Sequence, residues 1–324
     1  MRLSVAGLLL LLAWLLPGAA RADAIHVGHF SLLPGSEGPQ SHELLADLPA
    51  DVSTRAPITW PGSCRPTGET RQTMAGRSRL LLRFACAGAL PATAVIRLPW
   101  PLDGASFRQQ GGEHVSLLPD DRGISLPVGA SLAGPQPWTA LASDYLWQGM
   151  VHILTGWDHL AFVLCLCLLA RGRRLLLLVT LFTLGHSISL AGGFYDWISL
   201  PMPPVEAVIA LSILFMAREA LHSDGPGQWR RQALITGSFG LLHGLGFASA
   251  LGEMGVAADD RLPALLFFNL GVEAGQLLFV AAVLAVLAAA QRTGTAALMR
   301  TGSLYGAGAM AGFWLLERLA GFAA

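Results

Sequence analysis

The segment MVHILTGWDHLAFVLCLCLLA, residues 150–170, places two histidines and an aspartate inside a stretch that is otherwise largely apolar. The C-terminal part of the chain contains six apolar segments of this kind, near 142–170, 174–193, 203–221, 231–251, 262–290 and 297–320. Each has about 20 residues or more, enough for a helix to cross a bilayer core of about 30 Å. The sequence therefore predicts an α-helical bundle of about six or seven transmembrane helices over residues 141–324.

The composition is typical of a membrane protein with an additional soluble part. Of the 324 residues, 53% are hydrophobic and only 13% are charged, which is too apolar for an ordinary soluble protein. The formal net charge is zero, so we expect no nucleic-acid partner. The sequence has neither a His-Glu-x-x-His zinc motif nor a glycine-rich phosphate loop. Membrane lipid is the first partner that the composition indicates.

Residues 1–22 have the pattern of a signal peptide. Arg2 precedes an apolar core from Leu8 to Leu16, Pro17 ends this core, and Ala20-Arg21-Ala22 is a small-x-small cleavage site. The apolar run is too short for a good membrane span. Whether the leader is cleaved after Ala22 or remains as an anchor, residues 23–140 are predicted to be exported.

The exported segment, residues 23–140, is predicted to be a small all-β, sandwich-like domain. It has frequent Pro and Gly residues between short apolar runs, a spacing typical of strands and turns. The runs are Leu80–Phe84, Ala94–Leu98, His114–Leu118 and Ile124–Val128. Cys64 and Cys86 are its only cysteines, and an oxidising compartment would let them pair, with two free thiols as the alternative. Such a disulfide would contribute about 3 kcal/mol in the chain-entropy model.

Arginines in the connections between the apolar segments predict the orientation of the bundle. The first, third and fifth connections are rich in arginine, and the second and fourth are poor in it. The arginines concerned are Arg171, Arg173, Arg174, Arg218, Arg230, Arg231, Arg292 and Arg300. The positive-inside rule places these connections in the cytoplasm. The first helix then enters from the exported side, which agrees with the signal peptide. We predict a bacterial-type inner membrane location with the N-terminal domain on the periplasmic side.

Six ionisable side chains lie within the predicted spans, namely His152, Asp158, His159, His186, His243 and Glu273. An aspartate near mid-bilayer costs about 2.5–3.5 kcal/mol on an insertion scale. Ionisable residues at such depth usually line a cavity, bind an ion or relay a proton. With the predicted topology, these residues fall roughly 10–17 Å below the outer surface. We interpret all six as candidate metal residues, with Glu273 also a possible proton carrier.

The first helix sets a geometric condition on this site. His152 and His159 are seven residues apart, so they face the same way but lie about 10 Å apart along a straight axis. One ion can contact both only if the helix is broken near Gly156. Two successive sites along a path are the alternative. Asp158 is expected either to orient a ligating imidazole or to ligate directly.

Other polar residues on the predicted helices are candidates for support of this site: Thr183, Ser187, Asn269, Gln276 and Glu206. His186 and His243 each follow a phenylalanine by four residues and have glycines nearby, which let helices approach closely. The stripe through Asn269 and Gln276 could equally be hydrogen-bonding glue between helices, and Glu206 suits the dipole of a first helical turn. Imidazole and carboxylate ligands favour Zn, Ni, Co or Fe over Mg or Ca.

These motifs resemble the HupE/UreJ family of membrane proteins, in particular its subgroup with a large exported N-terminal domain. The family's signature His-Pro-x-x-Gly-x-Asp-His is matched by His152, Gly156, Asp158 and His159, with Ile153 in place of proline. The runs FTLGHS at 182–187, FGLLHGLGFA at 239–248 and FNLGVEAGQ at 268–276 are similar to the subgroup as well. The resemblance implies nickel supply for hydrogenase and urease, and His152, Asp158 and His159 as metal-pathway residues.

Three functions are compatible with these patterns. The first is a divalent-metal permease for nickel or cobalt, in which the cation passes the His/Asp layer. The second is an intramembrane zinc-dependent hydrolase, in which three histidines and an aspartate hold a metal with one open position for water. The third is an assembly or sensor protein whose β domain binds a periplasmic protein partner. The permease, which is not an enzyme, is the function that the sequence favours, with Ni, Co or Zn as cargo or bound ion.

Overall fold

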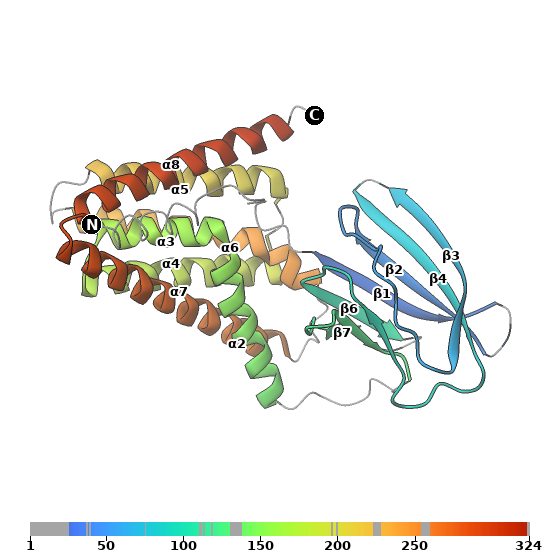
Figure 1. Cartoon of the computed structure of the whole chain (residues 1–324). Helices are drawn as coiled ribbons and strands as arrows, with labels where there is room; N and C mark the ends of the chain where they lie inside the picture. Colours follow the sequence, from blue (N-terminus) through green and yellow to red (C-terminus); the bar gives the residue numbers. More distant parts are fainter. Residues whose placement is uncertain are drawn as a thin grey trace. The chain divides into compact units, whose positions relative to one another are not determined.

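The computed structural model describes residues 26–36, 38, 40–74, 76–109, 112, 114–117, 119–129, 138–195, 197–198, 200–222, 228–253 and 260–322. The side chains of residue 114 and of residues 249–253 are not described. The structure divides into two compact units, one made of strands and one made of helices (Figure 1). The predicted signal peptide, residues 1–22, lies outside the described residues.

The strand unit contains a six-stranded sheet and a two-stranded sheet. The strands are β1 Val27–Pro34, β2 Ser41–Pro49, β3 Cys64–Met74, β4 Arg77–Cys86, β5 Val95–Leu98, β6 Gly104–Gln109, β7 His114–Leu117 and β8 Ile124–Pro127. The larger sheet has the order β3-β4-β2-β1-β6-β7, and β5 pairs with β8 in the smaller one. Only the pairing of β1 with β6 is parallel among these ladders.

One hydrophobic core joins the two sheets. β4 alternates strictly between buried and more accessible side chains, as expected for a strand with one face in a core. Its Leu80 and Phe84 belong to the same buried cluster as Ile96 of β5 and Leu126 of β8. The predicted apolar runs coincide with β4, β5, β7 and β8, although Leu118 lies outside the described residues. The polar β3 is exposed along almost its whole length, so its sequence has no apolar run from which the strand could be predicted.

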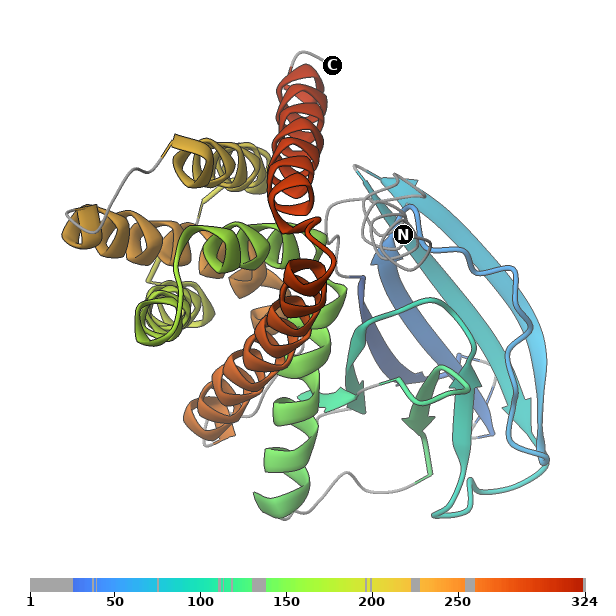
Figure 2. The ribbon, with the colours of Figure 1, turned by 60° about the vertical axis from the view of Figure 1, so that its left-hand side comes forward.

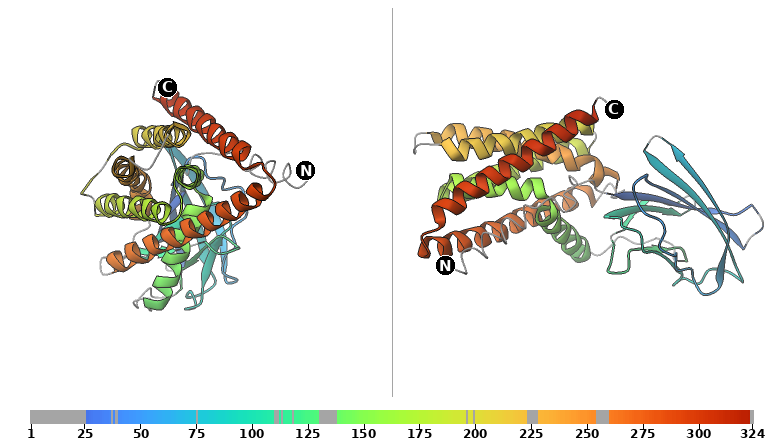
Figure 3. Two further views of the ribbon diagram at one scale, coloured as in Figure 1. Left: turned by 90° about the vertical axis from the view of Figure 1, so that its left-hand side faces the viewer. Right: turned by 45° about the horizontal axis from the view of Figure 1, so that its top comes forward.

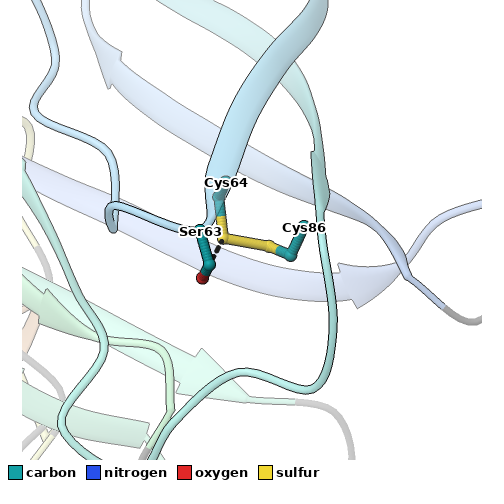
Figure 4. The surroundings of a disulfide bond; sticks show 3 residues. All are labelled: Ser63, Cys64 and Cys86. Carbon is teal, nitrogen blue, oxygen red and sulfur yellow. Dashed lines mark hydrogen bonds between the residues drawn. A yellow bond between two sulfur atoms is a disulfide. The ribbon is translucent and has the colours of Figure 1, made fainter.

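A disulfide ties the two ends of the β3–β4 hairpin together. Cys64 and Cys86 are direct partners across the antiparallel pair, and their sulfur atoms are bonded (Figure 4). Both side chains lie in the core of the strand unit. The bond closes the hairpin at the end where the chain enters β3 and leaves β4. The two cysteines of the helical unit, Cys165 and Cys167, are free and buried.

The helical unit consists of seven helices in the described residues: α2 Trp138–Thr155, α3 Trp157–Leu169, α4 Arg173–Phe194, α5 Met202–His222, α6 Trp229–Glu253, α7 Arg261–Arg292 and α8 Ala296–Gly321. The first predicted segment, 142–170, is two helices instead of one. α2 and α3 are bent by 74° at the break between them. The other five predicted segments correspond to α4, α5, α6, α7 and α8.

Two helices, α4 and α7, are long and apolar enough to cross a membrane, and the bent pair α2–α3 gives a third span if it is counted as one. The predicted count of six or seven spans is therefore not confirmed among the described residues. The polar content of the remaining helices lowers their mean hydropathy. α5 contains Glu206, Arg218 and Glu219, α8 contains Arg300, Glu317 and Arg318, and α6 is rich in Gly, Ser and Thr.

Helix packing is close at glycines. α5 and α8 run side by side (Figure 3), and α2 crosses α7 (Figure 2). A Cβ atom at Gly149 of α2 would collide with the carbonyl oxygen of Phe268 on α7, and one at Gly271 of α7 would collide with the carbonyl oxygen of Leu146. The absence of side chains at these positions lets the two backbones touch, which is how small residues act between membrane helices.

Candidate metal site

The break at Gly156 brings the two histidines of the first predicted segment together. Gly156 has an extended backbone, with φ −71° and ψ 99°, and separates His152 in the last turn of α2 from His159 in the first turn of α3. Their ring centroids are 4.8 Å apart. A straight helix would separate these residues by about 10 Å. The broken helix, one of the two arrangements that the spacing allowed, is the one in the structure.

Histidines from two further helices complete a buried cluster. The ring of His159 lies 5.8 Å from that of His186 on α4 and 5.0 Å from that of His243 on α6, measured between centroids. Two groups result, one of His152, His159 and His186, the other of Asp158, His159 and His243. Within each group the candidate ligand atoms lie within 4.8 Å of one another. Two nitrogens on one ion are at most about 4.2 Å apart, so small side-chain rotations would suffice.

Hydrogen bonds around His243 determine which of its nitrogens carries the proton. The hydroxyl of Ser212 on α5 donates its only hydrogen to the carbonyl oxygen of Ile209, 2.6 Å away. Ser212 Oγ lies 3.0 Å from His243 Nε2, so it must accept a hydrogen bond from Nε2–H. The lone pair is then on Nδ1, which is buried and has no hydrogen-bond partner among the described residues. His243 is thus prepared to offer Nδ1 as a ligand.

His186 on α4 likewise has one ring nitrogen next to an oxygen acceptor, here from Asn269 on α7. The side-chain amide of Asn269 donates to the carbonyl oxygen of Leu265 at 2.8 Å, which fixes Oδ1 as its acceptor end. That oxygen lies 3.4 Å from His186 Nδ1, a long hydrogen bond that places the proton on Nδ1. Nε2 of the fully buried His186 then has the lone pair and no partner in the described structure. Metal-ligating histidines usually hold their second ring nitrogen in this way.

Asp158 acts on the histidine that follows it in the chain. Its Oδ1 accepts a hydrogen bond from the backbone N–H of His159 at 2.8 Å and lies 2.9 Å from His159 Nδ1. A carboxylate beside Nδ1 favours the proton on that nitrogen and the lone pair on Nε2. The aspartate was predicted either to orient an imidazole or to ligate, and this geometry favours orientation of His159. Its membership in the second group leaves direct ligation chemically accessible as well.

Backbone contacts between α4 and α6 position their two histidines. A Cβ at Gly240 would collide with the carbonyl oxygen of Phe182, and one at Gly244 would collide with that of His186. Gly185 faces the backbone of α6 in the same way. Because these glycines let the helices touch, the side chains of His186 and His243 reach the same place. This outcome agrees with the role that the neighbouring glycines suggested in the sequence.

Phenylalanine rings enclose the cluster. Phe247 lies 4.2 Å and Phe268 5.6 Å from the ring of His152, and these two phenylalanines stack on each other at 4.8 Å. Phe182 lies 5.1 Å from the ring of His243, between centroids. His152, Asp158, His159, His186 and His243 are all at most 9% exposed. The polar groups therefore lie in an apolar shell, which strengthens every electrostatic interaction inside it.

Glu273 belongs to neither of the two groups. It was predicted to lie at the same depth as the histidines. Its carboxylate oxygens lie within hydrogen-bonding distance of the hydroxyl oxygens of Thr180 and Thr183 on α4, at 2.8 and 2.5 Å. The side-chain oxygen of Gln276, one turn further along α7, lies 2.8 Å from the hydroxyl oxygen of Thr183. The polar stripe of α7 is thus divided: Asn269 contacts the histidine cluster, and the other two residues form a separate polar group with α4.

The remaining supporting candidates lie outside the cluster. Ser187 donates to the carbonyl oxygen of Thr183 in its own helix, at 2.7 Å. Glu206 at the start of α5 forms an ion pair of 3.5 Å with Arg318 of α8, whose side chain is largely buried. Ser212 and Thr180 were missed in the sequence, because a single hydroxyl on an apolar helix carries no signal of its own. Only the positions of His243 and Glu273 in space give these residues their partners on other helices.

Comparison with known proteins gives one match. A family model described as "HupE / UreJ protein" matches residues 130–318, which is more than half of the chain and extends over α2 to α7 and most of α8. No curated protein and no solved structure matches the chain. The matched range contains every residue of the histidine cluster.

Proposed function

Because this chain belongs to the HupE/UreJ family, which implies metal transport of the nickel/cobalt type, we propose that it is a membrane permease for a divalent transition-metal cation, nickel or cobalt. The observation that carries the proposal is the hydrogen bonding of the ring nitrogens of His186 and His243. Each has one nitrogen held by an oxygen partner and the other buried without one. Burial of an unpaired polar nitrogen is costly, and a metal ion is the partner that would satisfy it.

The donor set supports a transition metal as the substrate. Four imidazoles and one carboxylate suit nickel, cobalt and zinc, whereas magnesium and calcium prefer oxygen ligands. We further propose that the cation enters from the exported side, with the protein in a bacterial-type inner membrane. The signal-peptide pattern and the arginine-rich connections support this orientation.

The overlap of the two groups suggests how the ion moves. His159 is a member of both groups, so a cation bound with His152 and His186 can exchange these ligands for Asp158 and His243 while it keeps His159. Each intermediate position then has at least one protein ligand, which avoids a bare ion in an apolar shell. Transport requires a site that binds strongly enough to admit the ion and weakly enough to release it. Two sites of few ligands meet this requirement better than one closed cage.

The substitution His159→Ala tests this function. We expect it to reduce metal uptake by proteoliposomes at least tenfold, because it removes the ligand common to both groups. Ser187→Ala is the matched control, since that hydroxyl bonds only to its own helix in the described structure, and it should transport normally. Unchanged uptake in His159→Ala protein, in the face of a verified gradient, would refute the assignment.

Metal analysis of the same purified protein distinguishes transport from zinc-dependent hydrolysis. A permease should exchange its bound metal with free metal and move it down a gradient. An enzyme should retain a stoichiometric zinc ion that gradients do not displace. The reconstituted protein answers both questions in one preparation.

A further inference from the structure

Glu273, Thr180, Thr183 and Gln276 form a polar group between α4 and α7, apart from the histidine cluster. Thr180 Oγ1 lies 2.8 Å from Glu273 Oε1, and Thr183 Oγ1 lies 2.5 Å from Glu273 Oε2. Thr183 Oγ1 also lies 2.8 Å from Gln276 Oε1, on a side chain that is fully buried. The group joins the two helices that are each long and apolar enough to span a membrane.

With the amide of Gln276 oriented as in the structure, this group has one hydrogen fewer than its hydrogen bonds require. Thr183 has a single hydroxyl hydrogen but lies within hydrogen-bond distance of three oxygen acceptors, the side chains of Glu273 and Gln276 and, at 3.3 Å, the carbonyl oxygen of Val179. The amide nitrogen of Gln276, which could have supplied a hydrogen, is buried and has no partner among the described residues. A proton on Glu273 Oε2 removes the deficit. The carboxyl then donates to Thr183, and Thr183 donates to Gln276 Oε1.

The spacing of the oxygens is that of a hydrogen-bonded group. Oxygens that share one cation as neighbouring ligands are at least about 2.9 Å apart for magnesium and further apart for calcium. The separations of 2.5 and 2.8 Å around Thr183 are hydrogen-bond distances instead. The contact between Glu273 and Thr183 is at the short end of O–H···O hydrogen bonds.

The side chains that bond to Glu273 in the described structure are uncharged. No cationic side chain in the described structure forms an ion pair with it. The titratable residues of the helices packed around it are His186, Arg173 and Arg174 on α4, Arg261 and Arg292 on α7, and Asp144 and His152 on α2. All four arginines lie in the first or last turn of their helices. A carboxylate without a counter-charge among apolar helices is strongly disfavoured relative to the protonated acid.

We propose that Glu273 is a proton-binding site and that the proton it carries is the coupling ion of the permease. The proposal rests on the proposed transport function and adds the identity of the ion that moves against the metal. In the exchange step, the O–H bond of Glu273 breaks, a water molecule takes the proton, and the carboxylate stays behind. Thr180 and Thr183 then both donate to the carboxylate, and Gln276 Oε1 loses its donor.

The same two helices connect this site to the histidine cluster. Thr183 precedes His186 by one turn on α4, and Glu273 follows Asn269 by one turn on α7. Asn269 in turn holds His186 Nδ1. A small displacement of α4 against α7 therefore alters the hydrogen bonds of Glu273 and of His186 together. Metal binding and proton binding can therefore be coupled through the relative position of α4 and α7.

Infrared spectroscopy of the full-length, metal-free protein tests the proton site independently of transport. We expect a carbonyl stretch of a protonated carboxyl at neutral pH that disappears in Glu273→Gln. The band should shift, but persist, in Thr183→Val, because that variant loses one hydrogen bond and keeps the acid. Glu317→Gln, at an exposed position of α8, should leave the band unchanged. Absence of the band from the wild-type protein, which an ionised Glu273 beside a reversed Gln276 amide would produce, overturns the proposal.

Proteoliposomes that contain a pH indicator test the coupling. A metal gradient should drive opposite proton movement in the wild-type protein, and Glu273→Gln should reduce that proton movement at least tenfold. Metal flux without proton movement in the wild-type protein refutes the coupling and leaves the permease intact. Loss of metal flux in the wild-type protein itself refutes the permease. The two failures are therefore distinguishable.

Discussion

Ser212 is a single hydroxyl on an apolar helix, and it determines which nitrogen of His243 faces the metal site. Its hydrogen is used by the carbonyl oxygen of Ile209, so its oxygen can only accept from the imidazole. Asn269 has the same effect on His186 through a different bond. At the scale of single residues, the site depends as much on these two partners as on the histidines themselves.

Ser212→Ala tests this dependence. The substitution removes the acceptor of Nε2–H and lets His243 place its proton on either nitrogen, so metal affinity should fall by about 10–100-fold. Titration calorimetry of the purified protein with nickel measures the change. Ser189→Ala is the control, because that buried hydroxyl bonds only to carbonyl oxygens of its own helix. Equal affinities in the two variants would contradict the tautomer argument.

Among the secondary-structure elements, the break between α2 and α3 has the largest effect on the site. Gly156 ends one helix and begins the next, and its extended backbone lets His152 and His159 turn toward each other. Its conformation is open to other residues, since φ is negative. The constraint is space: a Cβ atom there would lie 2.8 Å from His159 Nδ1 and 2.9 Å from the carbonyl oxygen of His152.

We expect Gly156→Ala to lower metal affinity about tenfold while helix content stays unchanged, because the added methyl group displaces His159 from its position beside Asp158. Titration with nickel and circular dichroism give the two values. Gly302→Ala on α8 is the matched control, since open space surrounds a Cβ at that position. A proportional loss of helix content in Gly156→Ala would indicate misfolding instead of a local effect.

Pairing of β2 with β4 makes the strand unit sensitive to acid. Burial raises the pKa of the Asp47 carboxyl, but hydrogen bonds and charges of Arg77 and Arg79 outweigh it and hold the pKa below the usual 3.8. A pKa that is lower in the folded state stabilises that state above the unfolded value. The contribution is therefore present above pH 3.8 and is lost as the pH falls through the folded-state pKa.

Hydrogen exchange of the intact protein measures this effect. Protection of the β2 and β4 amides should decrease as the pH is lowered below 3.8, after correction for intrinsic exchange rates. Asp47→Asn should weaken this pH dependence, whereas Asp121→Asn in an exposed turn should retain it. An identical pH profile in wild-type and Asp47→Asn protein would exclude the ion pairs as its source.

For the whole molecule, orientation in the membrane is the property that decides the direction of transport. The signal-peptide pattern and the arginine-rich connections independently predict that the N-terminal domain lies outside. Residues of the odd connections should then be accessible only from the cytoplasm. Gly294, in the turn between α7 and α8, belongs to such a connection.

Single-cysteine labelling tests this orientation. A membrane-impermeant thiol reagent should label Asp121→Cys in intact cells, and should label Gly294→Cys only after the cells are permeabilised. The native cysteines are a disulfide pair and two buried thiols, so background labelling should be low. Labelling of Gly294→Cys in intact cells would reverse the proposed topology.

Periodicity, apolar length and loop charge predicted the two-part organisation of this protein and its candidate site residues, because these are local properties of a chain. Imidazole and carboxylate groups in apolar segments also indicated a metal before any helix was placed. Local patterns allowed a break near Gly156 but did not decide between it and a straight helix, and they could not reveal the partners of His186 and His243 or the separation of Glu273 from the cluster. The partners of these three residues lie 31 to 93 positions away in the chain, and the packing of helices through their glycines brings them within hydrogen-bonding distance.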